Sequence, residues 1–200
     1  GSTNEIGVFE MQKNGLVEVE NPSEYMLNGK PENASGSVVV CAMEGTRPML
    51  MEIQALVCRS NFGMPRRTAN GIDHNRVSLL MAVIEKSAGI ILGNYDAYVN
   101  IIGGIKLNEP AIDLGIIATV ASAYKNVPIP QTTVVMGEVG LTGEVRRINL
   151  IEKRLKEAEK LGFKTCIIPE NNKKGLKDEY KLDIIGVKNI GEALRKLNIK

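Results

Sequence analysis

The chain has 200 residues, of which 44% are hydrophobic and 24% charged, a composition typical of one globular domain with its own core. Its net charge is only +2, and with 4% aromatic residues and no tryptophan the core must be aliphatic. No apolar run is long enough to span a bilayer and no signal-peptide pattern opens the chain, so we expect a cytoplasmic protein without a membrane partner.

The charge is unevenly distributed along the chain. Residues 1–100 contain 8 Lys and Arg against 11 Asp and Glu, whereas residues 101–200 contain 17 against 12. The two halves therefore carry −3 and +5. This asymmetry indicates a basic face that a polyanion could use.

The N-terminal part is predicted to be a hairpin followed by a connecting loop. Residues 5–11 and 16–19 have β-strand character, and Asn14-Gly15 between them readily takes the positive φ angles of a tight turn. Residues 21–36 are rich in Asn, Pro, Gly and Ser, which predicts a loop. We expect residues 1–36 to precede a core formed by residues 37–200.

The core is predicted to be a single α/β domain with early hairpins and later βαβ connections. Asp73 is expected to cap a helix that Gly89 ends, and Pro110 to occupy the first turn of a buried helix. Residues 59–72 are predicted to form an exposed loop. Strands are expected at 37–43, 48–57, 95–102, 132–139, 165–169 and 182–187, and helices at 73–87, 110–123, 148–161 and 190–197.

The sequence predicts no metal or cofactor site in this chain. Cys41, Cys58 and Cys166 are far apart and set in apolar or strand-like runs, which favours buried free thiols in a reducing cytoplasm. There is no CxxC pair and His74 is the only histidine, so a zinc site is not expected. No GxxxxGK[ST] motif occurs, so the chain alone should not bind or hydrolyse ATP.

Two segments resemble the C-terminal domain of Lon proteases: NEPAIDLG at 108–115 and GEVGLTGEVRRINLIEKR at 137–154. In that family a Pro-Ser-Ala-Gly turn presents the nucleophilic serine, and a Gly-Gly-Leu-Lys-Glu-Lys helix start presents the lysine that activates it. The resemblance places Ala111 at the serine position and Glu152 at the lysine position. A serine–lysine dyad needs a hydroxyl and a neutral amine. The resemblance therefore implies a kept scaffold without catalytic residues.

Asp113 also departs from the Lon pattern, because it occupies the place of the glycine two positions after the serine. A carboxylate in the first turn of a helix interacts favourably with the helix dipole. We therefore predict that Asp113 caps its helix and takes no part in catalysis.

Longer runs resemble the RadA (Sms) family of bacterial DNA-repair ATPases, whose C-terminal third is a Lon-like domain. They are NEIGVFEM (4–11), GLVEVENPSEYML (15–27), EGTRPMLMEIQALV (44–57), PRRTANGIDHNRVSLLMAVIEK (65–86) and EPAIDLG (109–115). Similarity extends over roughly residues 3–170. It implies the Lon proteolytic-domain fold, which is similar to domain 2 of ribosomal protein S5.

For the intact protein the resemblance implies parts that this chain lacks. They are a zinc finger and a RecA-like motor that uses ATP and Mg. It also implies a ring hexamer, branch migration during recombination, and a RecA-type recombinase as partner.

The basic residues are the candidate ligands of DNA, either single-stranded or branched. Arginine suits phosphate oxygens through paired hydrogen bonds, and such contacts are independent of base sequence. The candidates are Arg59, Arg66, Arg67, Arg76, Lys86, Lys106, Arg146 and Arg147. Ordinary solvated surface or salt bridges at a subunit interface would explain the same residues.

Three functional hypotheses follow. The first is a non-enzymatic platform that contacts the DNA backbone and serves as the scaffold of a hexamer. The second is a Lon-type serine peptidase with an unrecognised dyad. The third is an oligomerisation module without DNA contact.

Overall fold

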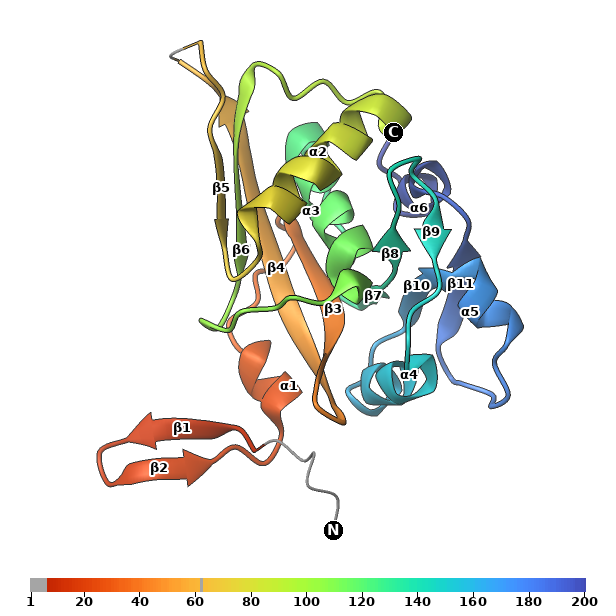
Figure 1. Cartoon of the computed structure of the whole chain (residues 1–200). Coiled ribbons are helices and arrows are strands. Elements are labelled where there is room, and N and C mark those ends of the chain that lie inside the picture. Colours follow the sequence, from red (N-terminus) through yellow and green to blue (C-terminus); the bar gives the residue numbers. More distant parts are fainter. Residues whose placement is uncertain (1–6, 62) are drawn as a thin grey trace.

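A seven-stranded mixed β-sheet forms the centre of the protein. The computed structural model describes residues 7–61 and 63–200, and Figure 1 shows the sheet with helices packed against it. The strand order is β11-β10-β7-β3-β4-β6-β5. The strand bounds are β3 Ser37–Glu44, β4 Arg47–Arg59, β5 Arg67–Asn70, β6 Tyr95–Ile101, β7 Thr133–Val135, β10 Thr165–Pro169 and β11 Asp183–Val187.

The sheet combines an antiparallel half with parallel strands. β3, β4 and β6 pair antiparallel, with Cys41 opposite Leu50 and Leu56 opposite Tyr98. β7, β10 and β11 pair parallel on the other side of β3, and β5 pairs parallel with β6. Parallel neighbours need crossover connections, so the expected order of early hairpin and later βαβ units is confirmed.

The helices cover the sheet on two faces. Successive side chains of a strand point to opposite faces, and in β3 Val38 and Val40 join one core while Val39 and Cys41 join the other. The first core is closed by α2 His74–Ala88, α3 Asp113–Lys125 and α6 Ile190–Lys196, and the second by α4 Ile151–Lys160. The protein is a mixed α/β single domain, which is the predicted fold class.

Local signals account for the helix ends. Asp73 caps α2 by accepting a hydrogen bond from the backbone N–H of Asn75, and Gly89 ends it with a left-handed φ of 67°. The buried helix predicted from residue 110 begins with a single 3₁₀ turn, Pro110–Ile112, before α3. Proline suits the first turn of a helix because an N–H at that position would have no partner within the helix, so nothing is lost by its absence.

The N-terminal hairpin is confirmed within the described residues. β1 Phe9–Gln12 and β2 Gly15–Glu18 pair antiparallel around the Asn14-Gly15 turn, while the first residues of the predicted strand lie outside the described part. The loop predicted at 21–36 is wrong in part, because α1 Pro22–Met26 forms there. The side chain of Asn21 caps α1 by accepting from the N–H of Glu24.

Other predicted boundaries need correction. The predicted loop at 59–72 contains β5, an edge strand that forms because β6 offers it a partner. The strand predicted at 132–139 is divided into β7 and β8 Glu138–Val139, and β8 pairs with β9 Val145–Arg146. The sequence did not predict the short helix α5 Glu170–Lys174.

The cysteines are all free, but one of them is not buried. Cys41 and Cys166 are buried, as predicted, whereas Cys58 is exposed. Burial raises the pKa of Cys166 to about 12 and raises that of Cys41 further. Among residues 7–61 and 63–200, no helix combines the length and the apolar character that crossing a bilayer requires.

Candidate functional site

Ala111 lies at the edge of an open pocket of about 440 Å³. Its backbone is held in place, because its carbonyl accepts a hydrogen bond of 2.9 Å from the N–H of Gly137. The segment 147–150, which leads into α4, also lines this pocket. The position aligned with the Lon serine thus faces a pocket, and its side chain there is only a methyl group.

Glu152 lies in the first turn of α4 and is not among the residues that line this pocket. Its carboxylate accepts a hydrogen bond of 3.2 Å from the hydroxyl of Tyr180. Burial, and then the charge of Glu152, raises the pKa of Tyr180 above its usual range. The next residue, Lys153, donates to the carbonyl of Thr46 at 3.4 Å. The two positions aligned with the Lon dyad therefore have separate surroundings.

Arg154 connects the two Lon-like segments from inside the protein. Its side chain is 0% exposed, and its guanidinium forms an ion pair with Glu109, the residue before Pro110. Nη1 also donates to the carbonyl of Cys41 at 2.7 Å, and the other nitrogens donate to Asn149. Oε2 of Glu109 accepts from the N–H of Met43 at 2.9 Å. This network holds the start of α4, β3 and the Pro110 turn together.

The structural role of Arg154 was not predicted from the sequence. A signal was present, because Arg154 is three residues after Ile151 and four before Ala158 and so lies on the apolar stripe of the helix. A cation on such a stripe needs a buried partner. The partner, Glu109, is too distant in sequence to be inferred from this pattern.

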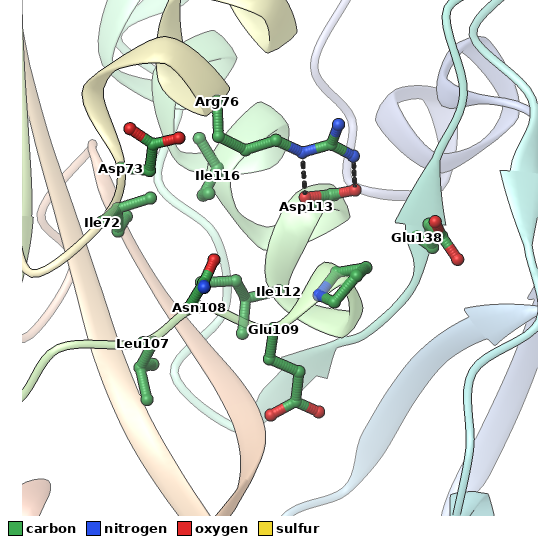
Figure 2. Close-up of a pocket in the computed structure, with 11 residues that line it drawn as sticks. Ile72, Asp73, Arg76, Leu107, Asn108, Glu109, Ile112, Asp113, Ile116 and Glu138 are labelled. Carbon is green, nitrogen blue, oxygen red and sulfur yellow. Dashed lines mark hydrogen bonds and ion pairs between the residues drawn. The ribbon is translucent and has the colours of Figure 1, made fainter.

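Arg76 on α2 binds Asp113 at the start of α3 (Figure 2). Nε donates to Oδ1 at 3.0 Å and Nη2 contacts Oδ2, so the guanidinium is bidentate. Asp113 is buried, and its Oδ2 also accepts the N–H of Val139 at 3.0 Å. The hydrogen bond with Asp113 raises the pKa of Arg76. Arg76 therefore joins α2, α3 and β8.

This geometry corrects the prediction for Asp113. The residue lies in the first turn of α3, as expected, but no side chain caps that helix. Its carboxylate instead binds a guanidinium and a strand N–H.

A second pocket, of about 220 Å³, lies beside this ion pair. Figure 2 shows Asp73, Asn108 and Glu138 around it. No cluster of His, Cys, Asp or Glu in the described part of the chain could hold a metal ion.

Three of the predicted DNA ligands lie together at one end of the sheet. Arg59, the last residue of β4, is opposite Tyr95, the first residue of β6, and its guanidinium lies 5.8 Å from the ring centre. Arg66 is exposed next to β5. Arg67 is half-buried and donates to backbone carbonyls, including that of Leu92 at 2.9 Å. Arg59 and Arg66 are therefore the members of this group whose charged ends are open to a ligand.

The remaining candidates lie on other elements. Lys86 is in the last turn of α2, and Lys106 is exposed between β6 and the Pro110 turn. Arg146 forms an exposed ion pair with Glu144 at 2.9 Å. Arg147 is exposed at the edge of the Ala111 pocket.

Comparison with known proteins finds similarity to one family model and to a set of DNA repair proteins. A family model described as subunit ChlI of Mg-chelatase matches residues 75–172, just under half of the chain. DNA repair protein RadA of Bacillus subtilis is 55% identical over 195 residues, which are 98% of this chain and 43% of that protein. The chain matches the RadA family of DNA repair proteins.

Two other RadA proteins match the chain with similar identity and coverage. RadA of Listeria monocytogenes is 55% identical over 98% of the chain and 43% of its own length, and RadA of Streptococcus pneumoniae is 52% identical over 98% and 47%. The chain thus spans less than half the length of the RadA proteins it matches, which is consistent with a C-terminal domain. The ChlI match is consistent with the predicted Lon-like fold class.

Proposed function

We propose that this RadA-like domain contacts the DNA backbone and helps to assemble a DNA-repair ATPase, without catalysing a reaction itself. The observation that carries the proposal is the identity of more than half of the residues to proteins named for DNA repair, over almost the whole chain. For the longer protein we propose ATP, Mg and Zn as cofactors, a ring hexamer, branch migration and a RecA-type recombinase as partner.

Among the candidate DNA ligands, we propose the exposed basic side chains as the contacts. Arg59 and Arg66 lie at one end of the sheet with their charges directed to solvent. Arg67 and Arg76 are occupied by partners inside the protein. Contacts by exposed arginines would be with phosphates, so we expect binding that is insensitive to base sequence and weakened by salt.

Fluorescence anisotropy with labelled single-stranded and branched DNA at several salt concentrations tests this proposal. The double variant Arg59→Ala/Arg66→Ala should bind more weakly, and its salt slope on single-stranded DNA should fall by about 0.7 for each phosphate that the protein no longer binds. Lys156→Ala removes one charge on α4 that pairs with Asp178, and it serves as the control. An unchanged slope in the double variant would refute the assignment.

Simple measurements distinguish the proposed function from the two alternatives, a Lon-type peptidase and a pure oligomerisation module. A Lon-type peptidase would cleave unfolded casein or a fluorogenic peptide, and we expect no cleavage because Ala111 supplies no nucleophile. Cleavage that disappears on mutation of a serine or lysine would overturn the proposal. A pure oligomerisation module would form multimers, yet show no salt-dependent affinity for DNA.

A further inference from the structure

The N-terminal hairpin exposes apolar side chains on both of its faces. Phe9 is 56% exposed, Met11 73% and Leu16 66%. Met11 is the cross-strand partner of Leu16, and Phe9 is two residues before Met11, so these three side chains share one face. On the other face Val17, the partner of Glu10, is 42% exposed. Apolar strands of this kind suit a sheet that is covered on both sides.

The hairpin is set apart from the rest of the protein. Among the described residues, β1 and β2 pair only with each other, and Figure 1 shows them beyond α1, away from the central sheet. An open cavity of about 550 Å³ is lined both by the hairpin, at Glu18, and by β4 and α4, at Arg47 and Lys160. An exposed hydrogen bond of 3.4 Å links the hydroxyl of Tyr25 on α1 to Glu10.

The next element, α1, is by contrast fixed to the central sheet. Ser23 is buried, and its hydroxyl accepts a hydrogen bond of 2.8 Å from the N–H of Leu50 on β4. Met26 is buried in the first core. The firm attachment to the sheet therefore begins at α1, and residues 19–21 form the short junction between α1 and the hairpin.

The hairpin needs support that the described part of this chain does not provide. A two-stranded hairpin alone is marginally stable in water, and further strands or packing against another element are needed for independent stability. Neither a third strand nor a helix covering the Phe9 face is present among the described residues. The apolar faces of the hairpin are therefore expected to have a partner outside these residues.

The longer protein proposed above contains a suitable partner. RadA of Bacillus subtilis and RadA of Streptococcus pneumoniae match 98% of this chain, which spans only 43% and 47% of their lengths. If this chain is the C-terminal domain, the ATPase part leads directly into the hairpin. A surface joined to the hairpin by the chain itself has a high effective concentration, so it is favoured over a surface on another molecule.

We propose that the hairpin packs against the preceding ATPase part of the longer protein, which buries Phe9, Met11 and Leu16. This inference rests on the proposed function, because the proposed function supplies the ATPase part. Residues 7–20 contain three glutamates and one lysine, so the surface that receives the hairpin should be apolar with a basic rim. The hairpin then connects the ATPase part to α1 through only residues 19–21, and a displacement of that part is passed to the central sheet.

Hydrogen–deuterium exchange, measured without DNA or nucleotide, tests the proposal. In this chain the amides of residues 9–18 should exchange almost as fast as those of an unfolded chain, because the hairpin lacks support. In the longer protein the same amides should exchange at least about tenfold more slowly. The amides of β3 and β4 should be protected in both proteins and provide the internal reference.

The substitution Met11→Asp should act differently in the two proteins. In this chain it changes an exposed side chain, so the melting temperature should not change. In the longer protein it should return residues 9–18 to fast exchange while β3 and β4 stay protected. Leu56→Asp, which alters an exposed leucine on β4, is the matched control and should leave the hairpin protected.

Two results would overturn the proposal. If residues 9–18 exchange equally fast in both proteins, the ATPase part does not cover the hairpin. If they are already protected in this chain, the partner lies within the chain or in a second copy, and the dependence of protection on protein concentration tells these apart. The exchange measurement uses no DNA, and the Arg59→Ala/Arg66→Ala titration leaves the hairpin unaltered. Each proposal can therefore fail while the other stands.

Discussion

Arg154 and Glu109 form a buried ion pair that joins the two segments that resemble Lon proteases. Arg154 lies two residues after Glu152, and Glu109 two residues before Ala111. The pair therefore fixes the relative position of the two segments. A buried ion pair rarely adds net stability over apolar residues, but the loss of one partner is costly.

Glu109→Gln should consequently lower the free energy of unfolding by about 3 kcal/mol, because the guanidinium of Arg154 would remain buried without its counter-charge. Urea unfolding followed by circular dichroism measures the loss. Adding Arg154→Met should restore more than half of it. The neighbouring exposed change Lys153→Met is the control and should stay within about 0.5 kcal/mol. A loss no larger than the control's would show that the pair is not structurally important.

Substitution of Arg76 should change the stability of the protein and not its DNA binding, whereas substitution of Arg66 should do the reverse. Arg76→Met leaves the buried carboxylate of Asp113 without its cation, so the free energy of unfolding should fall by about 3 kcal/mol. The salt dependence of DNA binding should not change. Arg66→Ala removes an exposed charge, so stability should stay within about 0.5 kcal/mol while the salt slope decreases. A reduced slope for Arg76→Met, measured well below its unfolding midpoint, would return Arg76 to the DNA-contacting group.

Leu150 has a left-handed backbone, with φ of 53°, immediately before α4. That conformation costs a residue with a side chain about 1–2 kcal/mol. Leu150→Gly should relieve this strain, but glycine also raises the conformational entropy of the unfolded chain, which offsets part of the gain. We therefore expect the free energy of unfolding to rise by about 0.5–1 kcal/mol.

Leu141, exposed and without a positive φ, provides the matched control for this change. Leu141→Gly adds the same flexibility without relieving strain, so it should lower the melting temperature slightly. Equal effects of the two substitutions would contradict the assignment of strain to Leu150.

Glu144 should make the stability of the protein depend on pH in the acid range. Hydrogen bonds from Thr142 and then from Arg146 lower the pKa of Glu144 to about 2 from 4.5. The folded state therefore binds the proton less readily than the unfolded state. The ionised Glu144 stabilises the folded state above pH 4.5, and this stabilisation is lost as the pH falls toward 2.

Melting temperatures of the unaltered chain and of Glu144→Gln, measured at steps from pH 6 to pH 2, test this dependence. The unaltered chain should be the more stable one near pH 6, and the difference should shrink on acidification. A difference that is constant with pH would mean that the Glu144 charge is not responsible.

The sequence by itself was sufficient for features that depend on neighbours along the chain. The Asn14-Gly15 turn, the β3–β4 hairpin and the capping of α2 by Asp73 arise from local backbone preferences and short-range hydrogen bonds. The RadA resemblance was likewise recognisable from the sequence alone, and the comparisons confirm it.

Only the tertiary structure decided which arginines are open to a ligand. Arg76, Arg67 and Arg154 find their partners at Asp113, at the carbonyl of Leu92 and at Glu109, which are 25 or more positions away in the chain. The edge strand β5 forms because β6 pairs with it, although its own residues predict a loop. The physical reason is the same in each case. A guanidinium or an edge strand takes its structure from a partner brought to it by folding, and a local pattern contains no information about that partner.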